Sequence, residues 1–518
     1  MNKNLQTVFH YHEITKHSQQ RYSRSLGYMD WATQPNPFRE YKGTSSIELP
    51  LALDNDTPPY HLLDSDLPSA PLLKESISQF LQFSMGIAAW KVSGDSSWAV
   101  RCNASSGNLH PSESYLILPP ILEEQNSKTT IFHYAPKNHI LESLASFETS
   151  FWDSLPQNSF LVGVSSISWR EAWKYGERAF RYVNLDAGHA WQQLVVSAKI
   201  LGWKMIKLDT LNDADLDKLL GTSQEKRFFE TERADMLFVV SPQTIESSLS
   251  VDKLLEDVPL VYEGVANKLS PSMYEWEIIP AIENATSMQQ IAQKDVIPQS
   301  INQKPTMGSK QVILNRRSIH VMNKENSLIT KEQFHTLLLN VRGSLDKKEN
   351  SAHLILFVHR VESYESGLYI LVRNQRDKEA LKEQMHSEFK WYETSLHSLY
   401  LLEERDLQMA SQAISCSQAI ASDGAFSLGM LCNFSEQLNE FGAHRYKELY
   451  WECGAIGQQL YLDTTSMGLS GTGIGCFLDN TLHNLLGLKN NNFQTLYHFT
   501  VGRGYVDSRI QTKPPYTR

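Results

Sequence analysis

The sequence predicts an α+β protein in which two copies of one domain are joined in a single chain, as an intramolecular pseudo-dimer. Residues 175–221 match residues 441–487 without a gap when the chain is shifted by 266 positions, from 175 to 441. Glycines, a Gln-Gln-Leu triplet and a closing Leu-Leu-Gly recur at the same places. A period this long indicates two joined domains rather than a solenoid. The predicted helices and strands do not alternate as strand–helix–strand units, which favours α+β over a parallel sheet.

The 518 residues are enough for several hydrophobic cores. We predict an N-terminal arm at residues 1–60, a first domain at 61–284, a linker at 285–310 and a second domain at 311–518. The arm is polar, aromatic and punctuated by prolines, and the linker is rich in Gln, Ser, Asn, Lys and Pro. Because each half should cover an apolar surface of the other, neither half is expected to fold when expressed alone.

Apolar patterns predict the same order of elements in both domains. In the first domain we expect a helix at 72–87, strands at 115–118, 130–134 and 160–164, a long helix at 182–203 and a strand at 236–240. In the second we expect a helix at 331–341, strands at 354–358 and 368–372, a long helix at 447–467 and a strand at 496–501. Four glutamines on the long helices should hydrogen-bond between helices, because buried amides need partners; they are Gln192, Gln193, Gln458 and Gln459.

Composition narrows the classes of function. The net charge is −10, with 41% hydrophobic and 20% charged residues, and no lysine-arginine block of the kind that binds nucleic acid. No apolar run is typical of a signal peptide or a membrane span, so we expect a cytoplasmic protein with no membrane partner. The five cysteines show no CxxC spacing, which predicts reduced, mostly buried thiols rather than disulfides.

The second domain carries basic residues that the first domain lacks. Arg316, Arg317 and Ser318 stand before a helix-forming segment, and Arg503 follows the last strand between two glycines. Arginine forks and a serine hydroxyl suit a phosphate monoester. A solvated basic pair at an element boundary is the alternative. The corresponding places in the first domain read 72–76 (LLKES) and 241–242 (SP), without an arginine.

A glycine-rich segment at residues 468–476 aligns with residues 202–210, which contain one glycine. Within it, Gly471, Thr472, Gly473 and Ile474 would let backbone amides approach a flat or anionic ligand. A flexible turn is the alternative. The segment is not a dinucleotide fingerprint, because it follows a predicted helix and Cys476 stands where the third glycine should be.

The first domain has a small polar loop with no counterpart in residues 341–354 of the second. Its central residues are Ser105, Ser106, Gly107 and Asn108. Hydroxyl and amide side chains before a strand suit hydrogen bonds to the rim of a polar heterocycle, although an ordinary loop would look the same.

Together these residues resemble the flavin-contacting elements of the FMN-dependent nitroreductase family. Residues 174–178 (KYGER) with Tyr182 and Gly188-His189, and residues 471–477 (GTGIGCF), resemble its SagB-type, thiazole/oxazole oxidase-like branch. Residues 12–17 (HEITKH) and 415–421 (SCSQAIA) resemble the tandem-domain subgroup of that branch. The resemblance covers nearly the whole chain.

The resemblance implies that FMN binds at the interface of the two halves. Because the halves differ, it implies one site per chain: Arg316, Arg317, Ser318 and Arg503 would hold the phosphate, residues 471–474 would line the ring, and residues 105–108 would reach across. His320 stands where the family commonly has another basic residue, so phosphate affinity is expected to be weaker or pH-sensitive.

In azoline oxidases of this branch a Lys-Tyr pair removes a proton from the heterocycle, and Lys174-Tyr175 matches that pair. A solvated lysine beside a packed tyrosine is the alternative. We expect an FMN-dependent oxidoreductase that dehydrogenates a heterocycle or C–N bond of a peptide or small metabolite. An NAD(P)H-dependent nitro or quinone reductase, and a flavin-binding partner of a biosynthetic complex without catalysis, stay open. No metal centre is expected, since the histidines at 10, 12 and 17 lack HExxH spacing. Further oligomerisation is also open.

Overall fold

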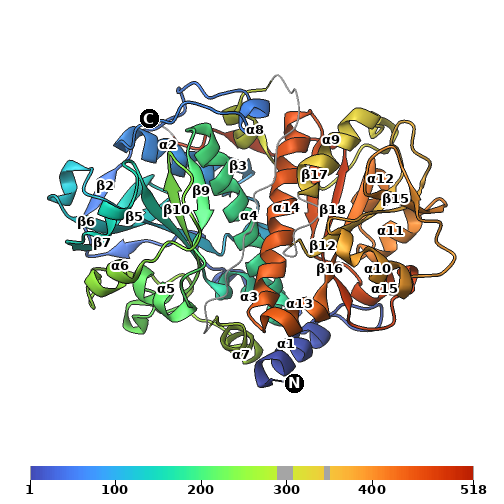
Figure 1. Ribbon diagram of the computed structural model, residues 1–518, viewed down its shortest axis with the longest axis horizontal. Helices are drawn as coiled ribbons and strands as arrows, with labels where there is room; N and C mark the ends of the chain where they lie inside the picture. Colours follow the sequence, from blue (N-terminus) through green and yellow to red (C-terminus); the bar gives the residue numbers. More distant parts are fainter. Residues whose placement is uncertain (1, 289–306, 344–349, 517–518) are drawn as a thin grey trace.

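The computed structural model describes residues 2–288, 307–343 and 350–516, and it divides into two similar halves (Figure 1). Two long helices, α4 (Ala179–Ile200) and α14 (Arg445–Ser466), lie side by side at the centre. A seven-stranded antiparallel sheet lies on the outer side of each helix. Most of the predicted linker, residues 289–306, lies outside the described residues. None of the described helices is long and apolar enough to cross a membrane.

The first half contains the elements up to α7. Its other helices are α1 (Lys3–Ile14), α2 (Lys74–Ser84), α3 (Ser168–Tyr175), α5 (Asp213–Leu220), α6 (Asp252–Asp257) and α7 (Ile278–Ala285). Its strands are β1 (Tyr41–Lys42), β2 (Ser46–Glu48), β3 (Ile87–Ser93), β4 (Ser96–Arg101), β5 (Ser112–Leu118), β6 (Thr129–Ala135), β7 (Ile140–Phe147), β8 (Phe160–Ser166), β9 (Lys204–Lys207), β10 (Arg233–Ser241) and β11 (Val265–Ala266).

The second half begins with α8. Besides α14, its helices are α8 (Ser309–Asn315), α9 (Lys331–Arg342), α10 (Lys378–Gln384), α11 (Gln408–Ile414), α12 (Ile420–Asp423), α13 (Phe434–Phe441) and α15 (Asp479–Leu486). Its strands are β12 (Ala352–Val358), β13 (Gly367–Leu371), β14 (Tyr392–Glu393), β15 (Leu399–Glu404), β16 (Phe426–Asn433), β17 (Ser470–Ile474), β18 (Phe493–Gly502) and β19 (Gln511–Lys513).

The repeat in the sequence is a repeat in the structure. The shift of 266 positions carries α3, α4 and α5 onto α13, α14 and α15 with identical bounds. The sheet orders correspond as well, β2-β7-β6-β5-β8-β10-β9 in the first half and β14-β15-β13-β12-β16-β18-β17 in the second. The predicted α+β tandem fold is therefore confirmed. The first long helix ends before the predicted residue 203 because Gly202 adopts φ +66°, which stops a helix.

The predicted glutamine contacts join the two central helices. Gln192 Nε2 donates to Gln459 Oε1 at 2.8 Å, and Gln458 Nε2 donates to Gln193 Oε1 at 2.6 Å. The two bonds occupy equivalent positions in the repeat, so they are related by the pseudo-symmetry. They satisfy buried amides at the centre of the interface.

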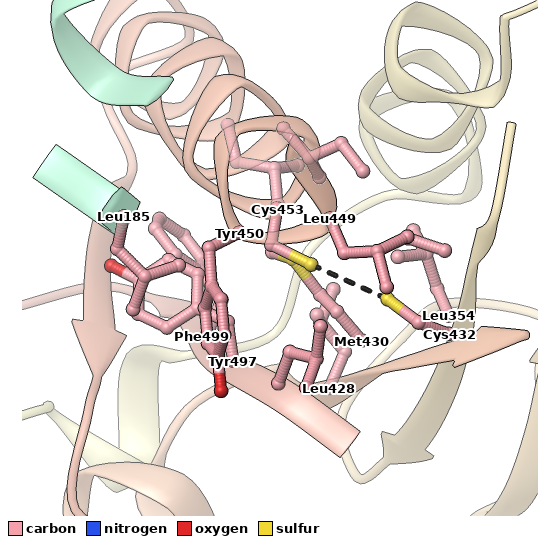
Figure 2. Close-up of a cluster of buried hydrophobic side chains, with 14 of the residues drawn as sticks. Leu185, Leu354, Leu428, Met430, Cys432, Leu449, Tyr450, Cys453, Tyr497 and Phe499 are labelled. Atoms are coloured by element: carbon pink, nitrogen blue, oxygen red, sulfur yellow. Dashed lines mark hydrogen bonds between the residues drawn. The ribbon is translucent and has the colours of Figure 1, made fainter. Parts of the chain in front are cut away.

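Each half also places one α4 or α14 side chain in the core of the other. Leu185 of α4 packs with Tyr450, Tyr497 and Phe499 of the second half (Figure 2). Trp451, at the position equivalent to Leu185, packs in the core of the first half. The two cores therefore continue across the interface.

The two chain ends are exchanged between the halves (Figure 1). Helix α1 packs on the second half, where the Phe9 and Phe434 rings lie 5.7 Å apart and His12 Nε2 lies 3.1 Å from Gln494 Oε1. At the other end, β19 pairs with β3 of the first half, through Thr512 opposite Lys91. Helix α1 thus covers part of the second half, whereas β2, from the same predicted arm, is the edge strand of the first sheet.

The structure excludes the turn alternative for the glycine-rich segment, because residues 470–474 form edge strand β17, paired with β18. The expectation of reduced thiols without a disulfide is wrong. Cys416 and Cys476 are joined in a disulfide with their Cα atoms 5.9 Å apart, whereas Cys102, Cys432 and Cys453 are free and buried. The spacing rules failed because the two cysteines are 60 residues apart and meet only through the tertiary fold.

Candidate functional site

The predicted phosphate-binding residues 316–318, called the phosphate segment below, lie directly beside the glycine-rich strand β17. Ser318 forms a parallel β-bridge with Gly471. The hydroxyl of Tyr461, on α14, lies 2.8 Å from Ser318 Oγ and accepts a hydrogen bond from the Gly473 amide at 2.8 Å. The fold thus brings together two predicted parts of the site that are far apart in the sequence. Ile474 is buried in a small apolar cluster behind the strand.

Thr472 makes a second contact between β17 and the phosphate segment. Its Oγ1 accepts a hydrogen bond from the Ile319 amide and donates one to the Ile319 carbonyl, both at 2.8 Å. The Thr472 side chain is therefore occupied in fixing the phosphate segment to β17. Its predicted contact with a ligand would have to come from its backbone.

Arg316 and Arg317 form a cationic pair with different roles. Arg316 is buried and donates to the Cys102 and Arg101 carbonyls of the first half, both at 3.0 Å. Arg317 is half-buried, and burial together with Arg316 lowers the pKa of Arg317 to about 10. Burial and Arg317 also lower the pKa of Lys91 on β3. Within the described ranges, no carboxylate lies within 4.0 Å of either arginine. No acidic side chain there neutralises the positive charge of the pair, which therefore suits an anionic ligand.

Arg503 comes from a different element, and its neighbour Gly504 lies against Ile319. It follows β18, and its backbone amide donates to Ser327 Oγ at 3.2 Å while its carbonyl accepts from the Asn323 amide at 2.6 Å. Its side chain is exposed and has no hydrogen bond or ion pair among the residues that the structure describes. Its place at the end of β18, next to β17, leaves it free to reach an anion from the solvent side.

The polar loop of the first half is held by an acid on α4. Both the amide and the hydroxyl of Ser106 donate to Asp186 Oδ1 at 2.9 Å. Ser105 Oγ accepts from the His110 amide at 2.8 Å, and Asn108 Nδ2 donates to a backbone carbonyl at 2.8 Å. Gly107 stays exposed, with φ +59°. The loop is therefore a rigid turn with its glycine at the tip.

The loop is also tied to the second half. The Ala104 amide donates to Gln458 Oε1 at 3.0 Å, so an α14 side chain fixes the start of the loop. Because Gln458 is fully buried, this bond is shielded from water. The loop and the phosphate segment are thus held to one another across the interface.

The candidate catalytic pair lies against the tip of the loop. Lys174 and Tyr175 end helix α3, and a methyl group on Gly107 would lie 2.6 Å from Tyr175 OH and 3.1 Å from Lys174 Nζ. The Tyr175 ring packs on Tyr182, with ring centroids 4.4 Å apart. Burial, and after it the acid Glu171, raise the pKa of Tyr175 well above its usual range. Tyr175 therefore presents a protonated phenol at neutral pH.

Of the residues that connect the two sides, the sequence pointed to His189 through the family resemblance but not to Asp186 or Tyr497. Asp186 Oδ1 lies 3.6 Å from His189 Nδ1, and His189 Nε2 lies 3.3 Å from Tyr497 OH on β18. Gly473 leaves room for that hydroxyl, because a methyl group there would overlap it. For Asp186 the sequence signal was a polar residue inside a long apolar helix.

Glu171 is a second acid that the sequence did not reveal. It is fully buried on α3, and neither of its oxygens has a hydrogen-bond partner within the described part of the chain. Burial, followed by Asp186, raises the pKa of Glu171 well above its usual range. A buried acid of this kind beside Lys174 and Tyr175 marks a candidate functional site.

The pseudo-symmetric place in the first half is built differently. Strand β9, the equivalent of β17, borders a cavity of about 270 Å³. Trp191 and Val195 line it where the second half has Gly457 and Tyr461. The segment beside β9 is 63–67, not the expected 72–76, and it offers Asp64, paired with Lys199, in place of arginine. Lys199, Lys204 and Lys207 also line the cavity, so this place differs from the second half by its lack of an arginine pair.

Comparisons with known proteins bear on the fold of the chain. The profile of the nitroreductase family matches residues 313–503. This part of the chain is similar to a nitroreductase domain. The expectation of an enzyme of this kind is confirmed by that match. No curated protein sequence matches the chain.

One solved structure extends the nitroreductase fold to both halves. The crystal structure of a protein from Anabaena variabilis, assigned as a nitroreductase, is 20% identical with a TM-score of 0.70, over 96% of this chain and 99% of its own. A protein from Ralstonia eutropha with the same assignment is 14% identical (TM-score 0.29), over 41% and 97%. A chain of the E. coli microcin synthetase McbBCD complex with truncated pro-MccB17 bound is 18% identical (TM-score 0.28), over 47% and 94%.

Proposed function

We propose that the protein is an FMN-dependent oxidoreductase of the SagB-type branch, in its tandem-domain subgroup, which dehydrogenates a heterocycle or C–N bond of a peptide or small metabolite. The observation that carries the proposal is the position of Lys174 and Tyr175 against Gly107, at the tip of the expected flavin loop. A nitroreductase domain without the proposed dehydrogenase activity would not need a Lys-Tyr pair beside the flavin ring.

The residues of the second half fit an FMN phosphate. Arg317 is a half-buried cation without a carboxylate in the described ranges, and the Ser318 hydroxyl is exposed beside it. Arg316 serves mainly to hold the first half, so Arg317, Ser318 and Arg503 would make the phosphate contacts. Guanidinium and hydroxyl donors match the phosphate oxygens.

The ring would lie between β17 and the polar loop. On one side, β17 would present its backbone to the ring, while Gly471 and Gly473 make room behind the strand for Phe499 and for the Tyr497 hydroxyl. On the other side, Ser106 is held by Asp186, so the loop keeps its shape without the ligand. A preformed site of this kind costs little ordering on binding.

When bound, FMN would supply hydride acceptance, which no side chain can provide. Lys174 would take the proton from the substrate, and Tyr175 would donate a hydrogen bond from its protonated phenol. Tyr182, packed on Tyr175, would fix the orientation of the Tyr175 ring and exclude water from its side of the site. Positioning and proton transfer are thus the tasks of the first half, and cofactor retention is the task of the second.

The test begins with the visible spectrum of the purified full-length protein. A flavin spectrum that persists after desalting is expected. Anaerobic titration should then show flavin bleaching by a peptide that carries an azoline ring and slow or no bleaching by NADPH. Rapid bleaching by NADPH alone would instead support a nitro or quinone reductase, the alternative that the nitroreductase domain favours. Absence of flavin would contradict the proposal.

A further inference from the structure

The disulfide between Cys416 and Cys476 differs from the other cysteines in where it lies. Both of its residues are half-buried, whereas Cys102, Cys432 and Cys453 are fully buried. Cys432 and Cys453 have their sulfur atoms 3.7 Å apart inside the core of the second half (Figure 2). Only the Cys416–Cys476 pair is therefore both bonded and within reach of an external thiol.

The disulfide joins two segments that have few other ties. Cys416 lies in the turn between α11 and α12, and Cys476 lies just after β17. The turn also makes a hydrogen bond from Gln418 Nε2 to the Cys476 carbonyl at 3.2 Å. Cys416 and Ser417 adopt φ values of +52° and +61°, which non-glycine residues rarely adopt without support from their surroundings.

The Cys476 segment contacts the candidate site directly. The carbonyl of Gly475 accepts hydrogen bonds from Tyr182 OH at 3.1 Å and from Arg178 Nη2 at 3.3 Å. Tyr182 in turn packs on Tyr175. One residue before Gly475, β17 ends, so a movement at Cys476 would reach both sides of the expected ring pocket.

We propose that Cys416–Cys476 is a reversible redox site, whose reduction by a dithiol releases the α11–α12 turn from the end of β17 and loosens that wall of the flavin site. The second part of this statement rests on the proposed function. In the reaction the S–S bond breaks, and two thiols form with two electrons and two protons from the dithiol, which leaves as a disulfide.

Two physical arguments support reversibility. A half-buried disulfide is open to attack by a thiolate, and exposed disulfides are the labile ones. The hydrogen bond from Gln418 to Cys476 and the bond from the Leu478 amide to the Ile414 carbonyl at 2.7 Å remain after reduction. Reduction should therefore loosen the turn without unfolding the domain.

The experiment uses the full-length protein, prepared without reductant and titrated anaerobically with dithiothreitol. Differential alkylation and peptide mass spectrometry would count the thiols at Cys416 and Cys476. Amide hydrogen exchange over residues 408–423 and 470–478 would report the mobility of the two segments, and flavin fluorescence would report release of the cofactor. We expect reduction to speed exchange in both segments about tenfold or more and to speed flavin release.

Two variants sharpen the test. The double variant Cys416→Ser/Cys476→Ser should behave like the reduced protein and should no longer respond to dithiothreitol. Cys432→Ala is the matched control, because that cysteine is buried on the far side of the core, and it should respond like the wild type.

Each outcome decides a separate claim. Free thiols at both positions in the untreated protein, or equal exchange in the oxidised and reduced forms, would overturn the redox site. Neither readout needs a flavin. A protein that shows the change in exchange but binds no flavin would contradict the proposed function and leave the redox site standing.

Discussion

Gly188 of α4 and Gly454 of α14 each face the backbone of the opposite helix where the two halves cross. A methyl group on Gly188 would overlap the carbonyl oxygen of Trp451, and one on Gly454 would overlap the carbonyl oxygen of Leu185. Positions 188 and 454, like 185 and 451, are equivalent in the repeat. The crossing is therefore symmetric to the level of single atoms, and it sets the distance between the halves.

Replacing either glycine should separate the helices. We expect Gly454→Ala to lower the free energy of unfolding by about 1–3 kcal/mol, as overpacking of a tight core does. Denaturant unfolding followed by circular dichroism would measure it. Gly308→Ala is a suitable control, since its methyl group would meet only Thr57 Oγ1, at 3.8 Å. Unchanged stability of Gly454→Ala would show that the helices can move apart at no cost.

The same symmetry relates two ion pairs with unequal burial. Lys447 Nζ lies 2.6 Å from Asp213 Oδ2, and the equivalent Arg181 Nη1 lies 2.8 Å from Asp479 Oδ1. Asp479 is fully buried and also pairs with Arg178 at 3.2 Å, whereas Asp213 is half-buried. Burial alone would raise the pKa of Asp479, but Arg178 and Arg181 hold that pKa well below its usual range.

Asp479→Asn should therefore cost more than Asp213→Asn. Removing one partner of a buried pair costs about 3–5 kcal/mol, and a half-exposed pair contributes about 1 kcal/mol. Because the folded pKa of Asp479 is depressed, its stabilisation is present above the unfolded value of about 3.9 and is lost as the pH falls below it. The difference between wild type and Asp479→Asn should shrink below about pH 4. Equal losses for the two variants at pH 7 would contradict this.

The sequence predicted the fold well because the fold rests on patterns that repeat. The long helices, the inner strands and the inter-helix glutamines all came from apolar periodicity and from the match between residues 175–221 and 441–487. These features depend on neighbours along the chain or on the equivalent neighbour in the other copy. Local patterns are sufficient for such elements.

The parts that escaped prediction depend on contacts between distant segments. Nothing near Cys416 indicates Cys476 as its partner. The glycines of β17 read as a turn, yet pairing with β18 makes them a strand. Asp186 and Tyr461, which hold the two sides of the site, look like interruptions of apolar helices until the fold places them beside Ser106 and Ser318. Site residues and cofactor contacts stay predictions for the same reason.

We predict that the protein loses stability at alkaline pH because of the buried side chain of His133. His133 lies 2.9 Å from Glu142 Oε2 and 3.3 Å from Glu113 Oε2 inside the first half. Burial lowers the pKa of His133, but the two glutamates more than compensate and raise it to about 9. This stabilisation is complete below the unfolded value of about 6.5 and disappears as the pH rises through about 9, a change of about 3 kcal/mol.

The free energy of unfolding, measured from pH 6 to pH 9.5, would test the raised pKa of His133. His133→Gln should be less stable than wild type near pH 6, and its stability should vary less across this range. A wild-type protein whose stability is constant from pH 6.5 to pH 9 would contradict the raised pKa.

One FMN per chain is expected, because the place equivalent to the phosphate segment carries Asp64 rather than arginine. Arg317→Gln should weaken FMN binding about tenfold or more, the effect of losing one charge-assisted hydrogen bond. Flavin absorbance per chain after desalting, and fluorescence titration, would measure both. Arg509→Gln removes an exposed arginine paired with Asp507 and should bind FMN like wild type. Two flavins per chain would contradict the single site.

Lys174 and Tyr175 should matter for turnover and not for flavin retention. Both contact the tip of the loop at Gly107, but neither belongs to the expected phosphate site. Lys174→Ala should keep its flavin and slow anaerobic flavin bleaching by an azoline peptide about 10²–10⁴-fold, the usual contribution of a proton-transfer group. Tyr175→Phe keeps the ring that packs on Tyr182 but removes the phenol, so it should slow the same step less.

The repeat supplies the matched control for this last prediction. Glu440 occupies the position in the second half that Lys174 occupies in the first, at the end of α13, and its side chain is exposed. Glu440→Ala changes an equivalent helix end on the side where no flavin is expected, so turnover should not change. If Lys174→Ala turns over as fast as Glu440→Ala, then Lys174 is a solvated surface group. The proton must in that case go to another residue of the site, and Glu171, buried one helical turn before Tyr175, would be the next to test.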